Sequence, residues 1–437
     1  MIDSSIHGEK KNKDNESPEN NHKTLISVPQ LEALDPQSYT LIDVRNEEAY
    51  QHGYIPGARN IPLKKFESGE EDFWGETPKK VIIYCAKGIL TDEPVLELRK
   101  NGFEAFHLEG GYVAWLKAQF AKENFENFID EAEPETETKK TDIHLRKDDS
   151  GYSNTSSQFK TPSPRYLDIE KSLRKKFHRN IFSKFAKAIN QYQLVQEGDK
   201  IAVCISGGKD SMLMAKLFQE LQRHNKFPFE VIFMIMDPGY SPDNREIIQN
   251  NARLLNFPYH LFESDIFDSV FNVEKSPCYL CARMRRGHLY SKAKELGCNK
   301  IALGHHYDDV IETILMGMVY GAQVQTMMPK LHSTNFPGME LIRPMYLIRE
   351  DDIKHWRDYN KLYFIQCACR FTDTCSIEPG GEGTGSKRME IKHLIKEMKK
   401  TNPFVEANIF KSMENVNIDT VVSYKEKGVK HHFLENY

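Results

Sequence analysis

Residues 202–217, AVCISGGKDSMLMAKL, decide how the larger part of this chain folds. An apolar run of strand type leads through two adjacent glycines into a helical pattern. Glycines let a backbone approach an anion, and the start of a helix offers free N–H groups and the positive end of its dipole. Lys209 adds charge, so the stretch predicts a phosphate-binding turn, with an ordinary glycine-rich turn as the alternative. A Walker A loop is excluded, because Val203 and Asp210 stand where that motif needs Gly and Ser or Thr.

Strand and helix patterns alternate on both sides of this loop. KIAVCIS (200–206), FEVIFMIMD (229–237) and KIALGHH (300–306) are typical of strands, and DSMLMAKLFQELQRH (210–224) is typical of a helix. A further helix is expected over 168–192, where apolar residues recur about every fourth position. This alternation predicts an α/β fold with a doubly wound parallel sheet, whose ligands lie at the carboxyl ends of the strands.

Polar side chains follow two of these predicted strands. Asp237 ends the second, and His305, His306, Asp308 and Asp309 follow the third at the start of a predicted helix. Paired carboxylates suit a magnesium ion on phosphates, and adjacent histidines suit a transition metal. Asp309 could equally be an acid that favours the helix start, and Asp237 a residue that forms the turn after its strand. The spacing leaves these alternatives open.

The length of 437 residues predicts more than one domain. No apolar run reaches the roughly 18 residues that span a membrane, and the amino terminus lacks a signal pattern. We therefore expect a cytoplasmic protein without a membrane partner. Composition predicts these parts: a disordered tail (1–23), a small α/β domain (24–120), a flexible acidic and Ser/Pro-containing linker (121–164), and a larger domain that ends in a basic helix (165–437).

The stretch KSPCYLCARMRRG (275–287) places Cys278 and Cys281 three residues apart, directly before three arginines. Further cysteines follow at 367, 369 and 375. Nearby thiols can form a closed tetrahedral zinc site, a redox couple, or an iron–sulfur site with one iron left open. From spacing alone, zinc and an iron–sulfur cluster are equally favoured.

Residues 174–211, 278–321 and 341–351 together resemble the tRNA 2-thiocytidine synthetase (TtcA) family, which are N-type ATP pyrophosphatases with a PP-loop. The resemblance extends over roughly residues 165–370. It implies ATP, with Mg²⁺ at Asp210, which is also a catalytic candidate. It further implies a nucleotide site made by these residues: Ser206, Gly207, Gly208, Lys209, Asp210, Ser211, Asp237, Gly304, His305 and Asp309.

The same resemblance implies a [4Fe–4S] cluster held by three cysteines, and it favours the cluster over zinc. Cys278 and Cys281 are two of the ligands, and we choose Cys367 as the third. Cys369 and Cys375 remain alternatives, because CAC stands where the family has CxxC. The zinc-binding CxxC pairs of the 2-thiouridine branch are absent from both ends of this domain, which favours cytidine as the target.

Two further stretches, LIDVRNEEAYQHGYIPGARNIPL (41–63) and VIIYCAKGILTDEPVLELRKNGF (81–103), resemble a rhodanese domain together with LEGGYVAWL (108–116). The resemblance implies that Cys85 carries sulfur as a persulfide, in a loop whose N–H groups cradle an anion. Leu90 replaces the arginine typical of such loops, so a binding-only domain with an inert thiol is the alternative.

Basic blocks lie in the 165–187 segment, after Cys281, and at 386–400. Such runs are usually solvated helix faces, but three around one nucleotide site favour a tRNA partner. From these blocks, together with the resemblance to the TtcA family, which implies thiolation of C2 of the cytidine at position 32 in the anticodon loop, we expect an ATP-dependent tRNA sulfurtransferase. Its rhodanese domain would relay sulfur from an upstream donor such as a cysteine desulfurase; a homodimer is also considered. Alternatives are a PP-loop enzyme making 2-thiouridine or a lysidine-like product, and a persulfide relay whose nucleotide domain only regulates.

Overall fold

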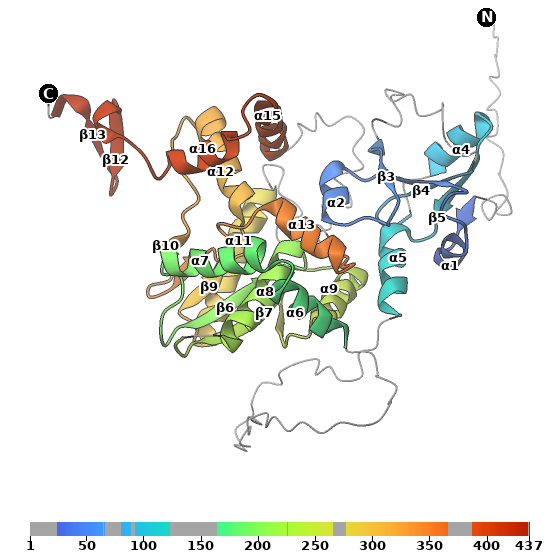
Figure 1. The fold of residues 1–437 in the computed structure, drawn as a ribbon, viewed down its shortest axis with the longest axis horizontal. Coiled ribbons are helices and arrows are strands. Elements are labelled where there is room, and N and C mark those ends of the chain that lie inside the picture. The colour runs from blue at the N-terminus through green and yellow to red at the C-terminus, as the bar shows by residue number, and fades with distance from the viewer. Residues whose placement is uncertain are drawn as a thin grey trace, which may run out of the picture. The chain divides into compact units, whose positions relative to one another are not determined.

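The computed structural model describes residues 24–63, 65, 80–88, 92–122, 164–224, 226–264, 277–365, 387–435 and 437. The predicted tail and most of the predicted linker lie outside these residues. The chain divides into two compact units, Met1–Asn124 and Phe125–Tyr437, coloured blue to cyan and green to red in Figure 1. Both units contain a sheet with helices between its strands, so the predicted α/β fold class is confirmed.

The first unit is built on a five-stranded sheet in the order β1-β5-β4-β2-β3, and every pairing in it is parallel. Its strands are β1 (Leu25–Ile26), β2 (Thr40–Asp43), β3 (Arg59–Asn60), β4 (Lys80–Tyr84) and β5 (Glu104–Leu108). Its helices are α1 (Val28–Glu32), α2 (Glu47–His52), α4 (Asp92–Lys100) and α5 (Gly111–Phe120). The core includes Val81 and Ile83 of β4 and Leu98 of α4, and Cys85 follows β4 directly.

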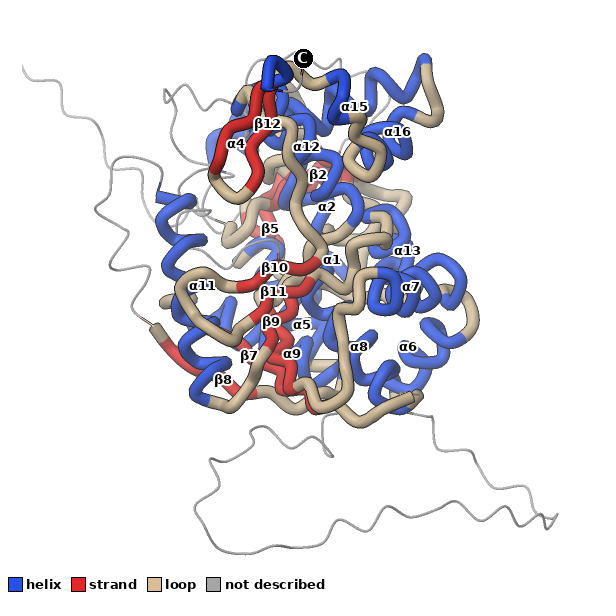
Figure 2. The backbone as a smooth tube through the Cα atoms, turned by 90° about the vertical axis from the view of Figure 1, so that its left-hand side faces the viewer, coloured by secondary structure: helices blue, strands red, loops and turns tan. Residues whose placement is uncertain are grey.

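The second unit is built on a six-stranded sheet in the order β10-β11-β9-β6-β7-β8. Its strands are β6 (Lys200–Ile205), β7 (Glu230–Asp237), β8 (His260–Glu263), β9 (Lys300–Ala302), β10 (Lys330–His332) and β11 (Glu340–Ile342). All pairings are parallel except that of the edge strand β10, which is antiparallel to β11. Figure 2 shows β10, β11 and β9 next to one another in this order. From β6 the chain proceeds to β7 and β8 on one side and returns to β9 on the other. The order of the strands therefore reverses between β6 and β9, and ligands of such sheets bind at that point.

Helices on opposite faces of this sheet enclose its core. Tyr290 and Ala293 of α11 (Pro277–Glu295) pack on Ala202 and Cys204 of β6. Successive residues of a strand point to opposite faces, so Val203 and Ile205, which are also buried, face the other side. The remaining helices before the loop and around it are α6 (Arg165–Arg174), the π-helix η2 (His178–Phe182), α7 (Ser183–Gln191), α8 (Lys209–Arg223) and α9 (Pro242–Leu255).

The carboxyl-terminal part adds helices at the end of the sheet where the loop lies. They are α12 (Tyr307–Gly321), α13 (Glu350–Tyr359), α15 (Lys387–Thr401) and α16 (Val405–Ser412). Ile391 and Ile395 of α15 and Phe410 of α16 form one buried cluster with Val310 and Ile314 of α12. The chain then forms a short hairpin of β12 (Ser423–Glu426) and β13 (Val429–His432), with the 3-10 turns η3 (Ile418–Thr420) and η4 (Phe433–Glu435) on either side. Among the described residues, no helix combines the length and the apolar character needed to cross a membrane.

Candidate functional site

The loop Ser206–Ser211 connects β6 to α8 at the reversal point of the sheet. The Ser211 hydroxyl donates to the Gly208 carbonyl (3.0 Å) and accepts from the Ser206 N–H (3.1 Å), which closes the turn on itself. Gly207 has a φ of +87°, in the left-handed region. The loop therefore presents the start of α8 to the end of the sheet, which is the arrangement of an anion site.

The carboxyl end of β9 lies directly beside this loop. A Cβ atom added at Gly304 would stand 3.2 Å from the Ser211 nitrogen, so the two backbones are in close contact. The next residue, His305, accepts from the Arg343 Nε–H at its Nδ1 (3.3 Å). Burial lowers the pKa of His305 to about 4, so its imidazole is neutral at physiological pH. The structure thus brings Gly304 to the predicted nucleotide loop, whereas the His305 ring contacts Arg343 after β11.

His306 and Asp309 form the amino-terminal cap of α12. The Asp309 carboxylate accepts from the His306 backbone N–H (2.9 Å), and the His306 ring accepts from the Asp309 N–H (3.4 Å). The structure therefore shows Asp309 in the role of an acid at the start of a helix, which was one of the alternatives for this residue. The same carboxylate also accepts from Arg388 (2.6 Å). Although burial opposes it, His306 and Arg388 hold the pKa of Asp309 down at about 2.

Lys209, the loop lysine, is almost fully buried and its ammonium lies between two carboxylates. One belongs to Asp210 (3.1 Å) and the other to Glu350 at the start of α13 (3.1 Å). Burial lowers the pKa of Lys209, but these acids more than offset that effect and hold it above its usual value. Lys209 is therefore a fixed positive charge at the start of α8, held by a residue that lies far away in the sequence.

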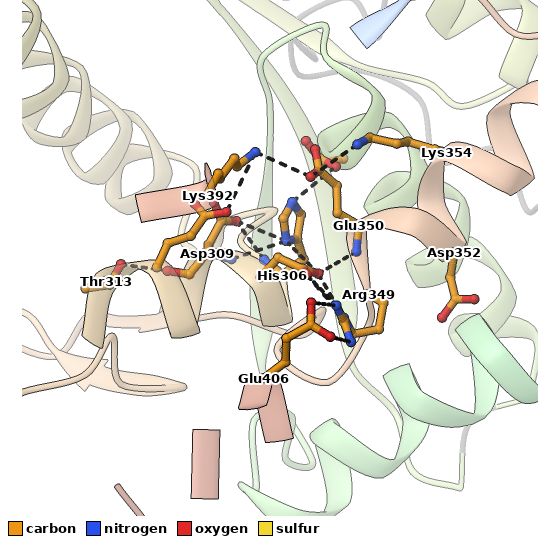
Figure 3. Close-up of polar contacts among 12 residues, drawn as sticks. His306, Asp309, Thr313, Arg349, Glu350, Asp352, Lys354, Lys392 and Glu406 are labelled. Atoms are coloured by element: carbon orange, nitrogen blue, oxygen red, sulfur yellow. Dashed lines mark hydrogen bonds and ion pairs between the residues drawn. The ribbon is translucent and has the colours of Figure 1, made fainter. Parts of the chain in front are cut away.

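Glu350 was not predicted, although its carboxylate contacts lysines from three helices, two of which, Lys354 and Lys392, are labelled in Figure 3. Besides Lys209 it contacts Lys354 (3.4 Å) and Lys392 of α15 (3.4 Å). Although burial opposes it, Lys209 and Lys392 hold the pKa of Glu350 far below its usual range. In the sequence Glu350 belongs to REDD (349–352), which looks like the acidic first turn of any helix. That pattern alone could not have indicated a site residue.

The basic helix at the carboxyl terminus also contributes to the site. Arg388 and Lys392 of α15 approach Glu312 of α12 at 3.6 Å and 3.7 Å. Burial raises the pKa of Glu312 to about 7, and these long contacts lower it only in part. The spacing of Ile391, Leu394, Ile395 and Met398 within 386–400 indicates one apolar helix face; Ile391 and Ile395 are buried, whereas Leu394 is 42% exposed. The sequence predicts a solvated or tRNA-facing surface for the basic side chains of this run, whereas Arg388 and Lys392 contact carboxylates beside the loop.

Arg349 joins the start of α13 to α12 and α16. Its guanidinium donates to Asp308 (2.9 Å) and to Glu406 (2.7 Å), as Figure 3 shows for Glu406. The Glu350 N–H donates to the same Asp308 carboxylate (2.7 Å). Asp308 therefore aligns the Arg349–Glu350 segment.

Asp237 ends β7 and is buried. One of its carboxylate oxygens accepts from the N–H groups of Gly239 (2.9 Å) and Tyr240 (2.6 Å), and the other lies 3.7 Å from Arg245. This is the turn-forming role weighed as the alternative for Asp237. A contact to a nucleoside remains a prediction.

The predicted cluster ligands fall mostly outside what the structure describes. Cys278 and Cys281 belong to the first turns of α11, but only the backbone is described there. Cys367, Cys369 and Cys375 lie outside the described residues. Among the described side chains, no group of three or more His, Cys, Asp or Glu could hold a metal ion. Cys204 and Cys298 are buried, and burial raises their pKa to about 12 and about 11, as expected of inert thiols.

Cys85 stands at the carboxyl end of β4 in the first unit and is buried. Its sulfur accepts from the Gly88 N–H at 3.1 Å, so one loop amide points at the thiol. The Tyr112 N–H donates to the Cys85 carbonyl (2.9 Å), which ties the loop to the start of α5. Leu90, which stands where such loops typically have an arginine, lies outside the described residues.

Two family models match the chain: a PP-loop domain over residues 177–369 and a rhodanese-like domain over residues 29–118. A tRNA-cytidine(32) 2-sulfurtransferase from Citrifermentans bemidjiense is 32% identical over 240 residues, which are 54% of this chain and 90% of that protein. A second, from Alkalilimnicola ehrlichii, is 32% identical over 269 residues, or 61% of this chain and 82% of that protein. The chain belongs to the tRNA-cytidine(32) 2-sulfurtransferase family.

Among solved structures, the U34-tRNA thiolase NcsA from Methanococcus maripaludis with its [4Fe-4S] cluster is similar at 21% identity and a TM-score of 0.41. That alignment covers 53% of this chain and 76% of the thiolase. The PP-loop match in this member of the sulfurtransferase family contains all the predicted nucleotide residues together with Cys278, Cys281 and Cys367. It ends before α15, so Arg388 and Lys392 lie beyond the matched region.

Proposed function

We propose that this chain is an ATP-dependent tRNA sulfurtransferase that replaces the C2 oxygen of a cytidine, at position 32 of the anticodon loop, by sulfur. Relatives of that name, 32% identical over 90% of their own length, carry the proposal. The geometry of the loop supports it, because the start of α8, Lys209 and the end of β9 meet at the reversal point of the sheet.

The loop residues bind ATP in this proposal. The N–H groups at the start of α8 and the Lys209 ammonium hold the phosphates that leave as pyrophosphate. Asp210 and Asp309 provide carboxylate oxygens for Mg²⁺, which needs only one or two protein carboxylates when phosphates complete its coordination. The cytidine O2 attacks the α-phosphorus, pyrophosphate departs, and the adenylated O2 then becomes a leaving group with AMP.

Sulfur must next attack C2 and displace AMP. Cys278 and Cys281 are three residues apart at the start of α11, and together with Cys367 they would hold a [4Fe–4S] cluster, because thiolates are the ligands of such clusters. When bound, the cluster would supply the sulfur-transfer chemistry. His305 follows β9 at the end of the sheet where the loop lies; burial keeps its imidazole neutral, and its Nδ1 accepts from Arg343.

Cys85 supplies the sulfur in this proposal, and an external thiol attacks its inner sulfur, so that the outer sulfur leaves as sulfide and Cys85 is left in a disulfide with that thiol. An upstream donor such as a cysteine desulfurase would load it as a persulfide, and the Gly88 N–H beside the sulfur would stabilise the anionic form. Carriage of both units on one chain raises the effective concentration of the persulfide at the second unit.

The test uses tRNA from a strain that lacks the gene, incubated with the purified chain, ATP, Mg²⁺ and a sulfur donor under anaerobic conditions. Nucleoside analysis should show 2-thiocytidine, and none should form without ATP. The Cys278→Ala variant should lose the iron and sulfide of the purified chain together with the activity. An unchanged nucleoside profile would refute the proposal, and full 2-thiocytidine formation by Cys278→Ala would show that the reaction needs no cluster held by Cys278.

A further inference from the structure

Helix α15 takes part in a closed ring of charged side chains that includes the loop lysine. Each member lies within 4.0 Å of the next, in this order: Lys209, Glu350, Lys392, Glu312, Arg388, Asp309, His306, Asp210 and back to Lys209. The tightest link is that from Arg388 to Asp309 at 2.6 Å. The ammonium groups of Lys392 and Lys209 contact the two oxygens of the same Glu350 carboxylate. Lys392 therefore stands one carboxylate away from the predicted phosphate loop (Figure 3).

The charge balance of this ring depends on α15. Among the described residues, the carboxyl groups of Asp210, Asp309, Glu312 and Glu350 face four permanent cations, Lys209, Lys354, Arg388 and Lys392, and α15 provides the last two. Without α15, only Lys209 and Lys354 would remain as permanent cations beside these four acids. A polyphosphate carrying several negative charges would be repelled by such a site. The phosphates of ATP therefore need the cations of α15 close by.

The way in which α15 is held suggests that its two cations are not there to attach the helix. Ile391 and Ile395 already anchor α15 on α12 with their buried side chains. The side chains of Arg388 and Lys392 are each about a third exposed, so they can turn toward a ligand. An ion pair used only for packing is usually worth little when it is partly exposed. The geometry suits side chains that exchange one anionic partner for another.

We propose that Arg388 and Lys392 bind the phosphates of ATP and hold the departing pyrophosphate, after leaving the carboxylates that they contact in the structure. Mg²⁺ binds the carboxylate of Asp309 in place of Arg388, and the released Arg388 guanidinium donates to a phosphate oxygen. No bond is made or broken in this exchange. The inference rests on the proposed function only in that ATP is the nucleotide.

The test compares ligands that differ in their phosphates. Dissociation constants of ATP, AMP and inorganic pyrophosphate, each with Mg²⁺, are measured by titration calorimetry on the full chain without tRNA. Arg388→Gln and Lys392→Gln should each weaken ATP and pyrophosphate by about tenfold or more, since each removes a charge-assisted hydrogen bond. AMP should bind within about twofold of the wild type, because α15 is proposed to touch only the phosphates that AMP lacks.

Lys399→Gln is the matched control, because Lys399 lies on the same helix and pairs with Glu406 at 2.8 Å. It should leave all three dissociation constants unchanged. If Arg388→Gln fails to fold, as judged by circular dichroism, Arg388→Lys and Lys392→Gln carry the test, and Arg388→Lys should lose only part of the ATP affinity.

An equal loss for ATP and AMP would mean that the two cations act only on the shape of the site, and would overturn the inference. Unchanged or tighter ATP binding would overturn it as well. A wild-type chain that binds ATP but never thiolates tRNA would refute the proposed function and leave this inference standing.

Discussion

Glu350 shares one carboxylate between lysines from the loop, from α13 and from α15. Lys209 is only 1% exposed, so the loss of this partner leaves a buried ammonium with Asp210 alone. We expect Glu350→Gln to lower the free energy of unfolding by about 3 kcal/mol, because an incompletely compensated buried charge is expensive. Chemical denaturation of the full chain measures it. Glu397→Gln removes the exposed partner of Lys400 and should leave the stability unchanged; equal effects of the two variants would contradict the role of Glu350.

Gly207 and Gly198 both have a left-handed backbone, with φ of +87° and +80°, but only Gly207 is crowded. A Cβ at Gly207 would stand 2.5 Å from Cγ1 of Ile248, whereas a Cβ at Gly198 would meet nothing within 4 Å. Gly198→Ala should therefore lower the free energy of unfolding by about 1 kcal/mol through backbone strain alone. Gly207→Ala should lower it further and weaken ATP binding. If Ile248→Ala partly restores the ATP affinity of the Gly207→Ala variant, measured by titration calorimetry, the clash is the cause. If it restores none of the affinity, the clash is excluded.

Glu312 makes the stability of the second unit depend on pH in an unusual direction. Burial raises its pKa from 4.5 to about 7, and one of its oxygens is buried without a hydrogen bond among the described residues. Between these two values the folded chain holds the proton and the unfolded chain has released it. The contribution of protonated Glu312 to the free energy of unfolding is therefore fully present below pH 4.5 and is lost as the pH rises through 7.

The shift corresponds to a change of about 3 kcal/mol. The free energy of unfolding of the wild type, relative to that of Glu312→Gln, should fall by this order between pH 4.5 and pH 8. Denaturation of both proteins across this range measures the difference, in which the contributions of other groups largely cancel. A difference that stays constant with pH would show that Glu312 is ionised throughout.

Helix α15 depends on two isoleucines for its place beside the loop. Ile391 is 1% exposed and packs in the cluster that joins α15 to α12, whereas Leu394 on the same helix is 42% exposed. Ile391→Ala should lower the free energy of unfolding by about 2–4 kcal/mol through the cavity it leaves, and Leu394→Ala should have little effect. Since a loosened α15 also displaces Arg388 and Lys392, Ile391→Ala should weaken ATP more than AMP. Lost stability with an intact ATP affinity would show that the helix can move without the site.

The elements around the loop were predictable because their signals are local. The run that became β6, the glycine turn and the helix α8 follow one another within 200–223. The helix expected over 168–192 is instead α6, η2 and α7, with i→i+5 hydrogen bonds such as that from the Phe182 N–H to the Phe177 carbonyl. Phe177 and Ile181 are buried as their spacing predicted. The spacing of the apolar residues thus predicts which side of the helical segment is buried, but not where its hydrogen-bond register changes.

The site was predictable only where its residues follow strands. Ser206–Ser211 and Gly304–Asp309 stand at the ends of β6 and β9, and parallel strands bring such ends together. Glu350 and Arg388 reach the same place from helices far along the chain, through packing that no local pattern records. Their separate signals, an acidic helix start and an amphipathic basic helix, are common in proteins without such a site.

At the scale of the whole molecule, the chain joins a rhodanese-like unit to a PP-loop unit, each with its own core. If Cys85 hands sulfur to the second unit, the connection should matter more than any single contact, because a tether fixes the effective concentration at about the millimolar level. A protease site inserted between residues 124 and 164 lets the purified chain be cut without other change. After cleavage and dilution to micromolar concentration, thiolation driven by a cysteine desulfurase should fall by at least about tenfold.

Addition of the separate rhodanese unit should restore the rate of thiolation as its concentration approaches about the millimolar level. The same unit with Cys85→Ser should not restore it. Thiolation driven by free sulfide bypasses Cys85, so it should be the same before and after cleavage. A cut chain that works at the full rate with the desulfurase would show that sulfur reaches the second unit without Cys85. Together these experiments distinguish a tethered persulfide relay from a rhodanese unit that only binds.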